Sequence, residues 1–283
     1  MTAYRSRRTN TEMEAIRDSI VAVAREDQPV TVRQVFYRLV SEGVIDKTEN
    51  EYKSTVIRLI GELRLSGDLP WPWIADNTRW VRKPRTFRGV EDALTQTAEL
   101  YRRRLWDDLD TYVEVWLEKE ALAGVLVYVT DEWDVPLMVT RGYPSLTFLH
   151  TAGESFPTDR RTVVYYFGDH DPSGVDIARN TEARLREFAS DDADIEFHRL
   201  AVTAEQIVEW ALPTRPTKRT DTRARDWIGG SVEVDAIPPR ILRDMCNNAI
   251  VGHFDIDRLR VTLEAEQSER DILIAMRQFA GEV

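Results

Sequence analysis

The sequence has a single cysteine, Cys246, and no long apolar run. One cysteine excludes an internal disulfide and any zinc site built from several cysteines. No segment approaches the roughly 20 apolar residues of a membrane-spanning helix, and the basic N-terminus lacks the apolar stretch of a secretory signal. There is also no Gly-x-x-x-x-Gly-Lys motif, so no P-loop for ATP is visible. These absences indicate a cytoplasmic protein without a membrane partner.

Basic residues are outnumbered as well. The chain carries 38 Lys and Arg against 49 Asp and Glu, a net charge of -11, which at first argues against a nucleic-acid partner. The distribution is uneven: residues 1–90 hold 16 basic and 12 acidic residues, a balance of +4, and the remainder holds 22 and 37, a balance of -15. An acidic region can still act on DNA if its carboxylates hold metal ions that face the phosphates.

Helical periodicity dominates the first part of the chain. Apolar residues predict three helices, at 12–28, 33–43 and 50–67, with Thr11 as candidate N-cap of the first. The segment 69–80 has prolines and aromatics without helical period, which is typical of strands and loops. Three helices followed by a small β element predict a winged-helix domain.

The third predicted helix offers basic side chains to DNA. Lys53, Arg58 and Arg64 could contact phosphates from it. The alternative from the pattern alone is a small helical domain with a solvated, charged face. The winged-helix domain is assigned to residues 1–88, and a connecting helix to 89–110.

Beyond the connecting helix the period changes. Short apolar runs alternate with helical patterns, which predicts an α/β domain with a mostly parallel sheet over residues 111–283. The predicted strands are 111–117, 136–140, 161–167 and 194–201. In such sheets functional groups gather beyond the carboxyl ends of the strands.

Acidic residues stand at two of these ends. Glu118 follows the first strand, and Asp169 and Asp171 follow "RTVVYYF" one residue apart. Like charges this close repel, and Mg²⁺ prefers oxygen ligands. The pattern predicts a Mg²⁺ site of Glu118, Asp169 and Asp171, in which Glu118 could also exchange a proton with a substrate oxygen. A turn or capping role for the Asp-x-Asp is the alternative.

A tyrosine stands off the predicted apolar face of the second helix. That face consists of Val35, Phe36, Leu39 and Val40. Tyr37 is expected on the open face, with Arg33 one turn earlier on the same side. A tyrosine beside an arginine can approach a phosphate, whose charge the guanidinium stabilises. The alternative is a tyrosine that covers the edge of the core.

Three motifs then occur in order: "VEVWLEKEAL", "MVTRGYPS" and "VVYYFGDHDPSG". Together they resemble the Toprim domain, and most closely its form in the A subunit of topoisomerase VI and the meiotic recombination protein Spo11. In that family a strand-end glutamate precedes Lys-Glu, as Glu118 does here, and an Asp-x-Asp-Pro-x-Gly follows, as Asp169 and Asp171 do. "SVEVDAIPP" at 231–239 is similar to a late family segment.

The resemblance extends upstream, over roughly residues 12 to 260. An Arg-x-x-x-Tyr helix carries the family's nucleophile, matching Arg33 and Tyr37. This implies that Tyr37 attacks a backbone phosphate of double-stranded DNA and becomes joined to a 5′ end, with Mg²⁺ at the three carboxylates. It also implies a homodimer in which Tyr37 of one protomer meets the metal site of the other.

The chain resembles a minimal, stand-alone A subunit, such as mobile genetic elements carry, because only about ten residues precede the first predicted helix. A separate GHKL-type ATPase subunit is therefore an open question. Two other functions compete with transesterification: a hydrolytic Toprim nuclease, in which metal-activated water replaces Tyr37, and a non-catalytic DNA-binding module. The segment 212–227, with five basic residues, could follow DNA or form a surface loop.

Overall fold

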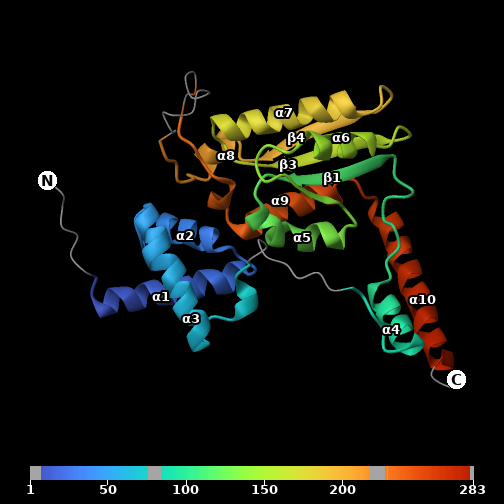
Figure 1. Ribbon diagram of the computed structural model, residues 1–283, viewed down its shortest axis with the longest axis horizontal. Coiled ribbons are helices and arrows are strands. Elements are labelled where there is room, and N and C mark those ends of the chain that lie inside the picture. Colours follow the sequence, from blue (N-terminus) through green and yellow to red (C-terminus); the bar gives the residue numbers. More distant parts are fainter. Residues whose placement is uncertain (1–7, 76–83, 217–226, 228, 281–283) are drawn as a thin grey trace.

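The computed structural model describes residues 8–75, 84–216, 227 and 229–280. A helical N-terminal unit precedes an α/β unit (Figure 1). The N-terminal elements are α1 (Asn10–Asp27), α2 (Val32–Ser41), the π-helix η1 (Glu51–Ile57), α3 (Arg58–Ser66) and the 3-10 turn η2 (Trp71–Trp73). The predicted helices are thus present, although the third begins as a π-helix.

Capping residues fix where the first two helices begin. Thr9, not the expected Thr11, is the N-cap of α1, because its hydroxyl accepts from Glu12 N while the Glu12 carboxylate accepts from Thr9 N. This reciprocal pair satisfies two donors that the helix leaves open. Thr31 and Gln34 form the same capping box at α2. Gly67 ends α3 in the left-handed conformation, at φ 88°, which glycine adopts without strain.

The expected wing is only partly within the described chain. Its first residues form the turn η2, and Ile74 makes an isolated parallel bridge with Val30. Residues 76–80 of the expected wing lie outside the described residues. The winged-helix assignment therefore stays a prediction.

The connecting helix is shorter than expected. α4 (Val90–Leu100) ends ten residues before the predicted limit at residue 110. The residues that follow it form hydrogen bonds with two helices further along the chain and do not continue the helix. Tyr101 donates to Glu269 at 2.6 Å, and Arg102 donates to the carbonyl of Asp131 at 2.7 Å. α4 packs along the C-terminal helix α10 (Ile256–Ala280), and the two helices together extend from the body (Figure 1).

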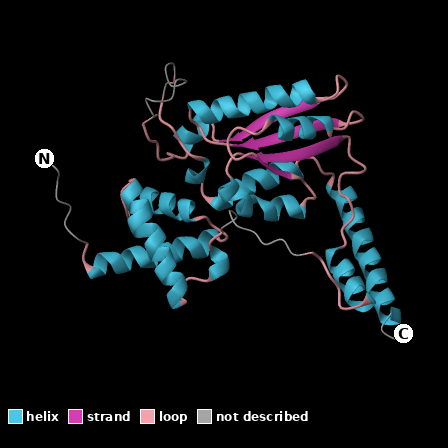
Figure 2. Cartoon of the chain, in the orientation of Figure 1, coloured by secondary structure: helices cyan, strands magenta, loops and turns pink. Residues whose placement is uncertain are grey.

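The α/β unit contains one sheet of parallel strands, which confirms the predicted class (Figure 2). Its order is β2-β1-β3-β4. The strands are β1 (Thr111–Leu117), β2 (Leu137–Val139), β3 (Arg161–Phe167) and β4 (Ile195–Ala201). The helical elements are η3 (Glu120–Leu122), α5 (Ala123–Glu132), α6 (Leu146–Glu154), α7 (Pro172–Phe188), α8 (Ala204–Glu209), η5 (Val234–Ala236) and α9 (Pro239–Val251).

Helices cover both faces of this sheet. α6 and α7 lie on one face, and α5 and α9 lie on the other (Figure 1). Alternate strand side chains serve the two layers: Trp116 and Tyr166 pack in the cluster under α6 and α7, whereas Leu117 and Phe167 join the larger core. None of the described helices is long and apolar enough to cross a membrane.

Candidate active site

Two of the predicted acidic residues meet where β1 and β3 end. The strands pair in register, with Leu117 opposite Phe167, so Glu118 emerges beside the loop that follows β3. There the Glu118 carboxylate accepts a hydrogen bond from Asp169 N at 3.0 Å. Both side chains are buried. The expected convergence of these two acids at the carboxyl edge of the sheet is therefore observed.

Two glycines permit this close arrangement. A Cβ on Gly168 would lie 2.6 Å from the Glu118 carboxylate, and one on Gly174 would lie 2.2 Å from the Asp169 carbonyl oxygen. Atoms cannot approach so closely, so only glycine fits either position while the carboxylates stay where they are.

The third acid, Asp171, has a structural task. Its carboxylate accepts from Gly174 N at 2.7 Å and caps α7. The capping alternative is thus observed for Asp171, and a metal-binding role for Asp169 stays a prediction. His170 lies between them, but its ring contacts the Val202 carbonyl and Trp227.

Burial and like charge perturb the two inner acids. Burial, with the charges of Asp169 and Asp171 in support, raises the pKa of Glu118 to about 7. Burial also raises the pKa of Asp169, although Lys119 opposes the shift. Glu118 is therefore close to half ionised at neutral pH, which suits a group that exchanges protons.

A cluster that was not singled out from the sequence adjoins this pair. Lys119 Nζ lies 2.6 Å from the Asp235 carboxylate, 2.9 Å from that of Glu233 and 3.2 Å from that of Asp169. Asp169 also accepts from Val234 N at 2.8 Å. The signal was present in "EKEAL" and "SVEVDAIPP", but sequence gives no sign that the two motifs touch.

Tyr37 is not on an open face, and this expectation was wrong. Its side chain is only 3% exposed, whereas Val40, placed on the buried face, is half-buried. The helical wheel accounts for packing within the N-terminal unit alone. The α/β unit lies against the side of α2 that the wheel leaves exposed. Arg33 joins the two units, because its guanidinium donates two hydrogen bonds to Glu233, at 3.0 and 3.1 Å.

Charges of both signs act on Tyr37. Lys47 Nζ lies 5.2 Å from the ring centroid and donates to the Pro213 carbonyl at 2.6 Å. Burial and the Glu233 charge raise the pKa of Tyr37 to about 12, while Arg215 and Arg33 oppose the shift. The tyrosine is thus protonated in the free protein, and the cations oppose the effects of burial and Glu233 without outweighing them.

The proposed DNA-contacting residues differ in accessibility. Lys53 and Arg58 are exposed, with side chains at 68% and 49%, and they pair with Glu49 and Glu62 on neighbouring turns. Arg64 instead donates to the carbonyls of Trp71 and Ile74 and lies over the Trp71 ring, so it holds the turn after α3. Lys53 and Arg58 are better placed than Arg64 to reach a phosphate.

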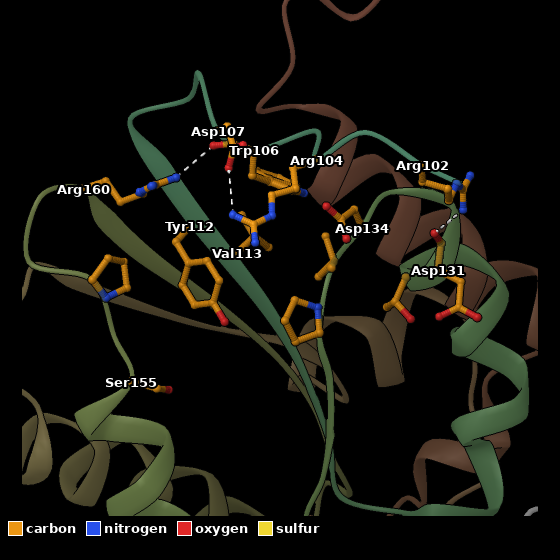
Figure 3. Close-up of a pocket in the computed structure, with 14 residues that line it drawn as sticks. Arg102, Arg104, Trp106, Asp107, Tyr112, Val113, Asp131, Asp134, Ser155 and Arg160 are labelled. Atoms are coloured by element: carbon orange, nitrogen blue, oxygen red, sulfur yellow. Dashed lines mark hydrogen bonds and ion pairs between the residues drawn. The ribbon is translucent and has the colours of Figure 1, made fainter. Parts of the chain in front are cut away.

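A cavity of about 810 Å³ lies elsewhere (Figure 3). Tyr112 and Val113 line it, so it lies at the amino end of β1, opposite the acidic edge. Its lining carries as many arginines as aspartates, namely Arg102, Arg104 and Arg160 with Asp107, Asp131 and Asp134. The charged side chains of the lining therefore balance.

In the part of the chain that the structure describes, no three His, Cys, Asp or Glu side chains are arranged to hold a metal ion. Of the segment 212–227, residues 217–226 lie outside the described residues, and Arg215 forms an ion pair with Glu233. The chain matches no protein-family model, and no significant match to it was found among the curated proteins or the solved structures.

Proposed function

We propose that this protein cleaves double-stranded DNA with Tyr37 as nucleophile, in the manner of the topoisomerase VI A subunit that its motifs resemble. One observation carries the proposal: Tyr37 lies among cations from separate segments, and one of those cations, Lys119, directly follows Glu118 at the acidic edge. A nucleophile, phosphate-binding cations and proton-exchanging carboxylates are the groups that such a transfer needs.

In the proposed step the Tyr37 oxygen bonds to the phosphorus and the bond from phosphorus to the 3′ oxygen breaks. The tyrosine gives up its proton, and the 3′ oxygen gains one, so the protons balance. Arg33 and Arg215 would stabilise the developing charge, since both lower the pKa of Tyr37 against the effect of burial. Glu118, whose pKa is about 7, would deliver the proton to the leaving oxygen.

Glu118 and Asp169 also fit a divalent cation. They are adjacent, buried oxygen donors with raised pKa values, and Mg²⁺ in phosphate sites commonly takes one or two carboxylates. Mg²⁺ bound there would neutralise charge on the phosphate. Asp171 would assist through its charge while it caps α7. We place a homodimer within the same proposal, and a separate ATPase subunit stays an open question.

The test uses supercoiled plasmid, purified protein and Mg²⁺, with the reaction stopped by denaturant. We expect cut DNA with protein attached to its 5′ ends, and loss of both in Tyr37→Phe. Tyr52→Phe is the matched control, because Tyr52 packs edge-on against Phe36 at 5.4 Å, as Tyr37 does. Absence of attached protein in the wild type, despite cutting, would refute the tyrosine mechanism.

One observation favours a second candidate, a hydrolytic nuclease. Glu118, with a pKa of about 7, could serve as a base toward water, whereas Tyr37 is buried and its pKa is about 12. This function predicts free 5′ ends and unchanged cutting in Tyr37→Phe. The plasmid experiment therefore separates the two.

A further inference from the structure

Three cationic side chains bind the Glu233 carboxylate, although one positive charge would neutralise it. Arg33 donates to both of its oxygens, Lys119 lies 2.9 Å away, and Arg215 forms a third ion pair. The side chain of Glu233 is 5% exposed. Burial raises the pKa of this carboxyl, but Lys119 and Arg33 outweigh it and hold the pKa at about 2. Glu233 is thus a buried anion at all ordinary pH values.

The three cations come from separate parts of the chain. Arg33 lies on α2, Lys119 follows β1, and Arg215 is positioned by a backbone bridge with Ser231, at 3.0 and 2.8 Å. Lys119 is shared with two aspartates, but the two guanidinium groups converge on the same carboxylate. A guanidinium that donates in parallel to two oxygens of one anion is also the arrangement that recognises a phosphate.

A fourth cation, Lys47, lies near Glu233 and adds to Arg33, Arg215 and Lys119. Burial, with the charges of Arg215 and Arg33, lowers the pKa of Lys47 to about 8, while Glu233 opposes the shift. Lys47 also lies over the ring of Tyr37. An anion that took the place of Glu233 would therefore keep the two arginines and Lys119 paired, next to the proposed nucleophile.

We propose that Glu233 occupies a phosphate-binding site, made by Arg33, Arg215 and Lys119, and that a DNA backbone phosphate displaces it. The assignment deepens the proposed function and rests on it for the identity of the ligand. The exchange conserves charge, because one carboxylate leaves and one phosphodiester arrives. Its two non-bridging oxygens replace the two carboxylate oxygens, and Glu233 moves toward solvent.

The experiment measures binding of a labelled 30-base-pair duplex by fluorescence anisotropy, in EDTA so that metal-dependent cutting does not intervene. Glu233→Gln removes the competing charge and should bind about tenfold more tightly or better, the effect expected when one charge-assisted hydrogen-bonded anion is lost. Glu187→Gln is the control, because it also removes one negative charge but from an exposed pair with Arg184. Its affinity should stay within about twofold.

A second measurement guards against a folding defect and distinguishes sources of phosphate. Thermal unfolding of Glu233→Gln is followed in sodium phosphate and in sodium chloride of equal ionic strength. Phosphate should raise its Tm, or restore folding if the variant unfolds, and should leave the wild type unchanged. If phosphate has no effect and the duplex binds no more tightly, the assignment is wrong; if phosphate stabilises but the duplex is indifferent, the site binds a free phosphate compound and not DNA.

These results are independent of catalysis. Tighter binding by Glu233→Gln, without any cutting of plasmid by the wild type, would retain the phosphate site and reject the enzyme. Unchanged binding by Glu233→Gln, with Tyr37-dependent cutting, would retain the enzyme and reject the competing role of Glu233.

Discussion

The raised pKa of Glu118 makes the stability of the protein depend on pH in a predictable direction. Its ordinary value is 4.5 and its value in the fold is about 7, so the folded protein favours the protonated acid. The stabilisation is fully present below pH 4.5 and is lost as pH rises through about 7. At 1.36 kcal/mol for each pH unit, the loss between pH 5 and pH 8 is about 2 to 3 kcal/mol.

Glu118→Gln removes this dependence. The amide keeps an oxygen that can accept from Asp169 N, now at 3.0 Å from the carboxylate, but it does not ionise. Urea unfolding of both proteins at pH 5, 6, 7 and 8 gives the difference in unfolding free energy, in which the other titrating groups cancel. We expect the variant to gain on the wild type by about 2 to 3 kcal/mol across this range. Parallel plots of unfolding free energy against pH would mean that the pKa of Glu118 in the fold is close to its ordinary value.

Mg²⁺ should oppose this trend in the wild type. A cation bound by Glu118 and Asp169 favours their ionised forms, so it should stabilise the protein more at pH 8 than at pH 5. At tenfold excess over its dissociation constant the gain is about 1.4 kcal/mol. Sodium chloride of equal ionic strength is the control. An equal response to Mg²⁺ in Glu118→Gln would place the cation elsewhere.

Two further substitutions test the packing of the site. Lys119→Met leaves three buried carboxylates without their shared cation and should lower the free energy of unfolding in urea by about 3 to 5 kcal/mol; Lys53→Met, at a 68% exposed side chain, should change it by less than about 1 kcal/mol. Gly174→Ala should cost about 3 kcal/mol or more by calorimetry, because its Cβ meets the Asp169 carbonyl. Gly61→Ala, which has open space within α3, should instead gain about 0.5 to 1 kcal/mol, and an equal loss in both variants would contradict the packing argument.

The sheet and its acidic edge follow from local patterns. β1 and β3 span the predicted residues 111–117 and 161–167, because each is an apolar run of strand length bounded by polar residues. Once two adjacent parallel strands are assigned, the residues after them must be neighbours, and Glu118 and Asp169 are. Periodicity and chain direction suffice for this much of the site.

Contacts between distant segments could not be predicted in the same way. Arg33 and Glu233 are 200 residues apart, and no periodic pattern links α2 to the segment before α9. A helical wheel assigns a single buried face to α2. It therefore places Tyr37 on the exposed side, but the α/β unit covers that side as well. The end of α4 at Leu100 likewise depends on partners in α5 and α10, which composition does not disclose.

The burial of Tyr37 also indicates what its proposed chemistry requires. A phosphate can reach a side chain that is 3% exposed only if α2 separates locally from the segment of Glu233. Polar bonds cross this junction, from Arg33 to Glu233 and from Lys47 to the Pro213 carbonyl, and α2 also packs against η5. A polar group that leaves one partner can bond to another, so the net free-energy cost of the exchange is small. Apolar surface that becomes exposed to water has no such replacement. Under the proposed function, DNA phosphates would open this junction by replacing its polar bonds, and we expect the ring of Tyr37 to keep its packing against Phe36.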